Sequence, residues 1–250
     1  MNTKTKLYSI FHEEKRYPQD ITFELIKGVR DYPEYIQEMI DYEWKIISKN
    51  NPYIYNGVCY SLISSKEIDN QLICEIQECS YKDFIGTNIK SINKITDTQL
   101  MANPLAACVV IITADKSIVV GKRSVKLAEG QQEWHIIGGT LEAKNQLPES
   151  PFELILKEIK EELNIDSEYI IDLHCTAMGR SFWNNKPEFL LKCITTLNDK
   201  QIATLYQSAS HKFEHDCISF IKQSDFPEFI KNNKFSPIGI AALASADILD

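Results

Sequence analysis

The sequence predicts an α+β fold, on three observations. Strand-like apolar runs occur in both halves of the 250-residue chain, an amphipathic helix precedes the first of them, and a well-delimited helix interrupts the later ones. Hydrophobic content of 44% and charged content of 25% are ordinary for a globular protein. A mixed, mostly polar segment at 81–103 separates the two patterned parts. We therefore expect an N-terminal α+β region over residues 1–100 and a second domain over residues 101–250.

The N-terminal region is expected to contain one helix and a pair of strands. The helix is predicted over residues 33–49, because apolar side chains recur there on one stripe: Ile36, Met39, Ile40, Trp44 and Ile47. The strands are predicted at 57–65 and 71–79, joined by a polar turn that contains Asp69 and Asn70. The segment at 81–103 is expected to link this region to the rest of the chain.

The second domain begins with three strand-like runs. They are LAACVVIIT from Leu105, SIVVGKR at 117–123 and EWHII at 133–137, and the third ends at Gly138-Gly139. After the central helix, the pattern predicts strands at 170–179, 187–197 and 217–221, with helices at 199–209 and 237–248.

The central helix has clear signals at both ends. Ser150 is the expected N-cap, Pro151 suits the first helical position, and Glu153 completes a Ser-x-x-Glu capping box. Asn164 stands where a left-handed residue ends many helices. An apolar stripe runs along the helix between these caps: Phe152, Ile155, Leu156, Ile159 and Leu163.

Three glutamates lie off that stripe, and they are the main functional signal. Glu158, Glu161 and Glu162 share one helical face because their offsets are three and four residues. Such spacing often marks only a solvated helix face. Here a Gly-Gly strand end lies just upstream, where another backbone can approach closely. Crowded carboxylates with this neighbour favour a divalent cation, and hard oxygen ligands suit Mg²⁺ or Mn²⁺.

Charge and cysteine content exclude several other classes. A formal charge of −8 argues against a nucleic-acid-binding surface, which needs basic residues. The seven cysteines form no Cys-x-x-Cys pair, so zinc is not expected, and buried reduced thiols in a cytoplasmic protein are the simpler interpretation. The N-terminus lacks a signal-peptide core, and no apolar run is long enough to span a membrane.

The segment from Gly138 to Ile165 resembles the Nudix hydrolase motif. Lys157-Glu158-Ile159-Lys160-Glu161-Glu162-Leu163-Asn164-Ile165 matches the second half of the family box, with Lys157 for Arg and Asn164 for Gly. Glu149 stands the expected eight positions before Lys157. The interval from Gly139 to Lys157 is four residues longer than the box allows, and the extra residues fall in the loop from Ala143 to Pro148.

This resemblance implies a fold, a reaction and a site. The fold would be a Nudix α/β/α sandwich with a mixed sheet, here with an N-terminal α+β extension. The reaction would be metal-dependent hydrolysis of a nucleoside diphosphate joined to another moiety. By resemblance, Gly138, Glu158, Glu161 and Glu162 are metal ligands, Lys157 orients the carboxylates, and one of the glutamates acts as base. A glutamate from a later loop, such as Glu214, is the alternative base.

The chain is also similar to a longer subgroup, the UDP-glucose pyrophosphatase-like Nudix proteins. The similarity rests on four pieces: Tyr81-x-x-Phe84-x-Gly86-Thr87, Ala102-Asn103-Pro104-Leu105, Gly121-Lys122-Arg123-Ser124 and Lys186-Pro187-Glu188. It implies a nucleoside diphosphate sugar as substrate, with an NMP and a sugar phosphate as products. The N-terminal region is then expected to close one side of the pocket.

The expected substrate-binding residues are Arg123, Arg180, Tyr81 and Glu188. Each has a plainer interpretation: a surface salt bridge for Arg123 and Arg180, and core packing for Tyr81. Trp134 is expected in the core rather than under a base, and Glu142 either supports the ligands or belongs to a turn. The histidines lack metal spacing, so we interpret His211, His215 and the others as structural or surface residues.

Three other functions stay open at this point. One is a Nudix hydrolase acting on ADP-ribose, dinucleotides or capped RNA. Another is a diphosphate isomerase on the same fold, which needs an acid near the substrate carbon, usually with a Cys. The last is a non-catalytic sensor of nucleotides, although such proteins tend to lose the box carboxylates, and all three are retained here.

Overall fold

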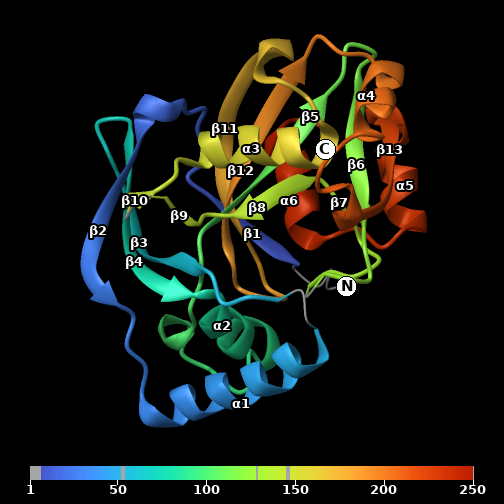
Figure 1. Ribbon diagram of the computed structural model, residues 1–250. Coiled ribbons are helices and arrows are strands. Elements are labelled where there is room, and N and C mark those ends of the chain that lie inside the picture. The colour runs from blue at the N-terminus through green and yellow to red at the C-terminus, as the bar shows by residue number, and fades with distance from the viewer. Residues whose placement is uncertain (1–6, 52–53, 128, 145–146, 250) are drawn as a thin grey trace, which may run out of the picture.

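A computed structural model describes residues 7–51, 54–127, 129–144 and 147–249. It has one large mixed sheet covered by helices and a smaller three-stranded sheet beside it (Figure 1). The α+β class predicted from the sequence is confirmed.

The large sheet is built mostly from the second half of the chain. In spatial order its main strands are β1 (Tyr8–Phe11), β11 (Ile170–Ser181), β12 (Pro187–Thr195), β5 (Ala106–Ile112), β6 (Ser117–Arg123) and β13 (His215–Lys222). Strand β12 runs parallel to β5, whereas the other neighbours are antiparallel. Two short strands attach to this path: β7 (Trp134–His135) to β6 and β8 (Ile137–Thr140) to β5.

Strand β5 shows why the sheet is covered on both faces. Alternate side chains of a strand point to opposite faces. Val109 and Ile111 belong to a core cluster that includes residues of α3 (Pro151–Leu163), while Cys108 and Val110 belong to another with residues of α6 (Pro237–Ser245). The shorter helices follow the same division: α4 (Asp199–Tyr206) joins the α3 side, and α5 (Phe226–Asn232) joins the α6 side.

The small sheet belongs to the N-terminal region. Its strand order is β2 (Ile21–Val29), β4 (Gln71–Ser80) and β3 (Val58–Ile68), and β3 and β4 form the predicted hairpin. Asp69 and Asn70 both have positive φ at the turn. The predicted helix is α1 (Glu34–Asn50), which lies below this sheet in Figure 1 with α2 (Tyr81–Phe84) and a π-helical turn (Ile85–Lys90).

The structure differs from the sequence predictions in several places, among them the added elements β2 and α5. The single strand predicted at 133–137 is two strands, because β7 pairs with β6 and β8 pairs with β5. The segment at 81–103 is folded rather than a polar link: its parts at 83–88 and 101–103 are buried, and Asn88 bonds inside the protein. Strand β1 comes from the N-terminal region but pairs with β11 in the large sheet.

The extra residues of the Nudix-like loop form a small hairpin. Strand β9 (Ala143–Lys144) pairs with β10 (Leu147–Pro148), and residues 145–146 lie outside the described residues. Across the described ranges, no helix combines the length and apolar character needed to span a membrane.

Candidate active site

Helix α3 is fixed at both ends as the sequence predicts. Ser150 is the N-cap, its side chain accepts a hydrogen bond from the Glu153 amide, and the Glu153 carboxylate accepts one from the Ser150 amide. Asn164 ends the helix with φ of 58°. Because these contacts fix where the helix starts and stops, they also fix which way its glutamates point.

A cavity of about 670 Å³ opens beside the glutamate face of α3. We call it the carboxylate cavity. Its acidic lining consists of Glu129, Glu142, Glu158, Glu161, Glu188 and Glu214. Its size is within the usual range for small-molecule sites.

Like-charge crowding is strongest at two glutamates of α3. Burial raises the pKa of Glu158 to about 9, and the nearby carboxylates of Glu162 and Glu214 add to that shift. Burial and Glu214 also hold the pKa of Glu162 well above its ordinary value. Carboxylates whose pKa values are raised by burial and by one another are arranged as a bound cation would require.

Two histidines contact glutamates of the site: His215 contacts Glu162, and His211 contacts Glu161 and Glu214. His215 is buried and its Nε2 hydrogen-bonds Glu162 Oε2, while Oε1 of the same carboxylate has no partner among the described residues. His211 Nδ1 lies 3.4 Å from Glu161 Oε2 and 3.4 Å from Glu214 Oε1. Burial lowers the pKa of His215 to about 4, with Arg123 acting in the same direction. His215 is therefore a neutral partner that does not cancel the charge of Glu162.

Glycines are required at the end of β8 for reasons of space. A Cβ on Gly139 would lie 2.3 Å from Glu158 Oε1. A Cβ on Gly138 would lie 2.6 Å from the backbone oxygen of Ala107 in β5. The Gly-Gly pair thus lets the strand approach the Glu158 carboxylate on one side and a neighbouring strand on the other.

The donor set fits a divalent cation by its chemistry. It offers several carboxylate oxygens, an unpartnered buried oxygen on Glu162 and a glycine backbone at the cavity wall. The side chains are not preassembled: within the described ranges, no three His, Cys, Asp or Glu residues are already grouped as a metal cage. These residues therefore match a divalent cation in the type and charge of their ligand atoms.

Residues of the N-terminal region form one wall of the carboxylate cavity. Tyr55, Cys59 and Tyr81 all line it. The Tyr55 hydroxyl donates to Glu142 Oε1 at 2.9 Å, and this bond, with burial, raises the pKa of Tyr55 to about 12. Tyr81 also packs against Phe84, with ring centroids 5.8 Å apart, so it serves both the cavity wall and local packing.

Positive charge enters the same cavity from two other strands. Arg123 at the end of β6 lines it, forms no ion pair within the described chain, and donates from Nε to the Glu129 backbone oxygen at 3.2 Å. Lys186 is buried, with Nζ 3.1 Å from Glu129 Oε1 and 3.5 Å from Glu188 Oε1. Burial raises the pKa of Glu188, and Lys186 opposes that shift.

Of the remaining predicted residues, Lys157 lines the carboxylate cavity, whereas Arg180 and Trp134 are not among its described lining residues. Lys157 lines the carboxylate cavity, and although burial opposes it, Glu158 and Glu161 raise its pKa. Arg180 lies on β11, is absent from the described cavity lining, and donates to Asn185 Oδ1 at 3.3 Å. Trp134 packs edge-on against Phe229 at 5.2 Å in the α6-side core, as expected.

No protein-family model matches this chain, and no curated protein matches it. Solved structures that it resembles include the Ap4A hydrolase of C. elegans, at 14% identity over 57% of this chain and 96% of that one (TM-score 0.40). A second is the MutT protein of Methanosarcina mazei, at 12% identity over 57% of this chain and 92% of that one, with a TM-score of 0.37. A third is a Nudix-family hydrolase of Clostridium perfringens, at 18% identity over 58% of this chain and 97% of that one, with a TM-score of 0.35.

The sequence motif resembles that of the Nudix hydrolases, and one of the solved structures named above is described as a hydrolase of that family. Identities and TM-scores this low assign neither an activity nor a substrate to the chain. The similarity to the UDP-glucose pyrophosphatase-like subgroup finds no counterpart among the structures named above and stays a prediction.

Sequence reasoning missed four residues of the site: Glu129, Lys186, His211 and His215. The histidines were predicted as structural or surface residues, and the structure places buried His215 against Glu162 and partly exposed His211 beside Glu161, contacts of which their spacing gave no sign. Lys186 stood within the quoted Lys186-Pro187-Glu188 piece, which was the one available signal. Glu129 had none, because its partner lies 57 residues away in the sequence.

Proposed function

We propose that this chain is a metal-dependent Nudix pyrophosphohydrolase that cleaves a nucleoside diphosphate joined to another moiety. The observation that carries this proposal is the crowding of Glu158, Glu161 and Glu214 around one cavity, with buried Glu162 close to Glu158 and the pKa of Glu158 and Glu162 raised. A stable protein has little reason to keep four such carboxylates together unless cations neutralise them.

The ligands for Mg²⁺ or Mn²⁺ would be Glu158, Glu161, Glu162 and the Gly138 backbone. Such an ion, when bound, offsets charge on the diphosphate and lowers the pKa of bound water. Glu214 faces the cavity from the 3-10 turn at Lys212–Glu214 and is our candidate for the group that accepts a proton from the attacking water. Its neighbour His211 holds it beside Glu161.

Arg123 and Lys157 are proposed to contact the phosphates. Arg123 suits this role because its guanidinium lines the cavity without a carboxylate partner in the described chain. Lys157 is next to Glu158 and exposed to the cavity. Arg180 drops out of this proposal because it does not line the cavity.

A nucleoside diphosphate sugar is the substrate class we propose first. It is supported by the N-terminal wall of Tyr55, Cys59 and Tyr81, which gives the cavity a side that the Nudix-like motif alone does not supply. ADP-ribose, dinucleotides and capped RNA are the alternatives. A non-catalytic sensor is disfavoured by the retained glutamates.

The deciding experiment combines a substrate panel with metal removal. Purified protein is assayed on UDP-glucose, ADP-ribose, dinucleoside polyphosphates and capped RNA with Mg²⁺ or Mn²⁺, and then in EDTA. We expect NMP and sugar phosphate from a nucleotide sugar, no turnover in EDTA, and recovery when metal is restored. Mg²⁺ should also raise the Tm, because it binds only the folded site. Full turnover in chelator would refute the metal role.

The isomerase alternative can be tested at one cysteine of the cavity, Cys59. Cys59 lines the carboxylate cavity, but burial raises the pKa of its thiol to about 12, so the thiol is neutral at physiological pH. A hydrolase does not need it. Cys59→Ser should therefore retain hydrolysis, whereas an isomerase using this thiol as its acid would lose activity.

A further inference from the structure

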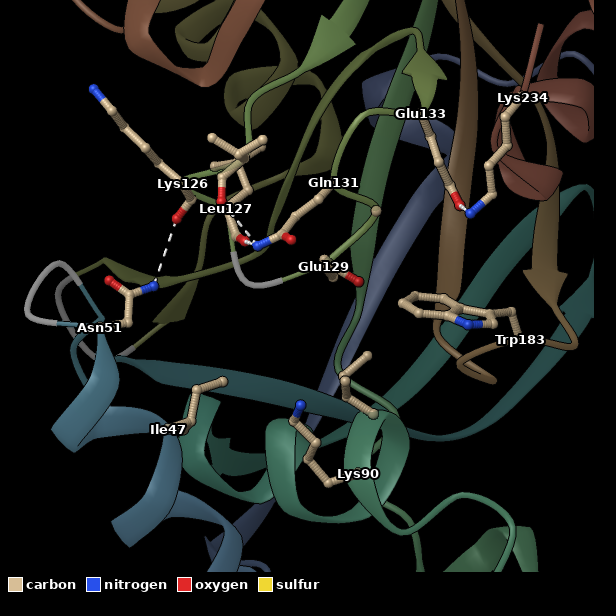
Figure 2. Close-up of a pocket in the computed structure, with 13 residues that line it drawn as sticks. Ile47, Asn51, Lys90, Lys126, Leu127, Glu129, Gln131, Glu133, Trp183 and Lys234 are labelled. Carbon is tan, nitrogen blue, oxygen red and sulfur yellow. Dashed lines mark hydrogen bonds and ion pairs between the residues drawn. The ribbon is translucent and has the colours of Figure 1, made fainter.

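A second cavity, of about 710 Å³, lies beside the first (Figure 2). We call it the Trp183 cavity. Its walls come from α1 and the π-helical turn of the N-terminal region, from the segment that precedes β7, and from the turn between β11 and β12. The two cavities share Asn51, Lys126, Leu127 and Glu129 as lining residues.

Trp183 presents an aromatic ring to this cavity (Figure 2). The side chain is 51% exposed and stacks on no other ring of the described chain. Its backbone is held in place, because its amide donates to Ser181 Oγ at 3.1 Å and the next residue, Asn184, bonds Glu129 Oε2 at 3.2 Å. A large exposed ring on a fixed turn is a typical ligand-binding feature.

Lys90 adds positive charge at the opposite wall. Figure 2 shows its amine directed into the space that the Trp183 ring also faces. The side chain is exposed and forms no ion pair within the described chain. By contrast, Lys234 at the edge of the same cavity is already paired with Glu133 at 2.9 Å.

A small hollow of about 40 Å³ relates the two cavities. Arg123, Lys186 and Glu188 line both this hollow and the carboxylate cavity, while Trp183 lines both the hollow and the Trp183 cavity. The groups therefore follow one another as the carboxylates of α3, then Arg123 and Lys186 with the glutamates that pair Lys186, then an exposed aromatic ring. A nucleotide has the matching order of diphosphate, sugar and base.

We propose that the Trp183 cavity binds the nucleobase of the substrate, which stacks on the Trp183 ring, while Arg123 and Lys186 lie along the phosphates. This inference rests on the proposed hydrolysis of a nucleotide at the carboxylate cavity. Stacking on an aromatic ring accepts any base, because every base has a π-face. Trp183 therefore selects substrates that carry a base without choosing among bases.

The test compares Trp183→Ala and Trp183→Phe with Phe182→Ala as the matched control. Phe182 is the adjacent residue, is 49% exposed, and does not line either cavity. Calorimetric titration with AMP, UMP and ribose 5-phosphate is done in EDTA, and kcat and KM are measured with Mg²⁺ on the best substrate.

We expect Trp183→Ala to weaken the binding of AMP and UMP by about 5-fold to about 150-fold, the range for loss of one stacked base. The KM of the substrate should rise by a factor in the same range. Ribose 5-phosphate, which lacks a base, should bind Trp183→Ala and the wild type equally. Trp183→Phe should restore most of the affinity, Phe182→Ala should match the wild type, and kcat should change little because the contact is remote from the reacting phosphorus.

The binding and kinetic measurements separate the two proposals. If Trp183→Ala binds AMP and UMP as the wild type does, or if the wild type binds neither, the nucleobase site is overturned whatever is hydrolysed. If the wild type binds both nucleotides through Trp183 but hydrolyses no diphosphate, the binding site stands and the proposed hydrolysis fails.

Discussion

Glu162 has the most unusual environment of any residue in the site. It is buried, one of its carboxylate oxygens has no partner in the described chain, and the other is bonded to a neutral histidine. Nearby Glu214 raises its pKa further. A negative charge at this position is disfavoured, as the raised pKa shows, and under the proposed function a metal ion would offset it.

Replacing Glu162 by Gln should separate function from stability. The amide keeps the shape and the bond to His215 but removes a ligand charge, so we expect kcat to fall by about 10²-fold. The Tm in EDTA should stay level or rise, because a buried like charge is gone. Glu168→Gln, on an exposed residue outside the site, is the control. Equal turnover of Glu162→Gln and wild type would place the metal elsewhere.

Replacing each of the two glycines of β8 by Ala should have a different effect: Gly139→Ala should lower activity, and Gly138→Ala should lower stability. In Gly139→Ala the new methyl displaces the flexible end of Glu158, so we expect about a 10²-fold loss of kcat with little change in Tm. In Gly138→Ala it meets the backbone of β5, so we expect a loss of about 1–3 kcal/mol in stability. Urea unfolding and steady-state kinetics of both variants check this. A reversed pattern would contradict the close approach of Gly139 to Glu158.

At the residue scale, the sequence predicted what helical periodicity brings together. The offsets of Glu158, Glu161 and Glu162 were enough to place them on one face. His215 could not be assigned in the same way, since its contact with Glu162 spans 53 positions and depends on β13 pairing with β6. The prediction for Arg180 rested on a place near a strand end like that of Arg123, and Arg180 is not among the described residues that line the carboxylate cavity.

At the element scale, α3 was predictable because its boundary signals are local. The capping box, the proline at the first position and the left-handed Asn164 all act within a few residues of the helix. Strand β1 and the split between β7 and β8 were not, because both depend on partners far away in the sequence. The buried segment at 81–103 looked polar because its Asn and Thr side chains are satisfied internally.

Removing the cap of α3 should weaken the whole site modestly. Ser150→Ala deletes the acceptor for the Glu153 amide, so we expect a loss of about 1 kcal/mol and a Tm lower by about 2–4 °C. Ser150→Asp, which also caps, should retain stability. Thermal unfolding of the three proteins measures this. No difference between the Ala and Asp variants would mean that tertiary packing alone fixes the start of α3.

At the scale of the whole molecule, the N-terminal region and the second domain share one core. Tyr60, Leu62 and Ile76 belong to the same buried cluster as Phe152 and Leu191. Backbone bonds cross as well: the Leu62 amide donates to the Asn103 oxygen at 3.1 Å, and the Leu105 amide to the Tyr60 oxygen at 2.8 Å. The predicted boundary at residue 100 stays a prediction, and these contacts favour a single folding unit.

Calorimetry should therefore show one unfolding transition for the full chain, with coincident loss of both regions. Asn88 gives the sharpest test, since its amide donates to Asn103 Oδ1 at 3.0 Å and to the Asn184 oxygen at 2.8 Å across the two regions. Asn88→Ala leaves the buried Asn184 oxygen and the Asn103 amide without these bonds and should cost about 1–3 kcal/mol.

If the regions form one unit, Asn88→Ala lowers the Tm of the single transition as a whole, and Mg²⁺ bound at the carboxylates raises it as a whole. Glu38→Ala, on an exposed residue of α1, is the control and should change neither. Two separate transitions, of which Mg²⁺ moves only one, would show instead that the N-terminal wall of the cavity unfolds independently of the metal site. Recognition by that wall would then be a docking event between two domains, and the division at residue 100 would be correct.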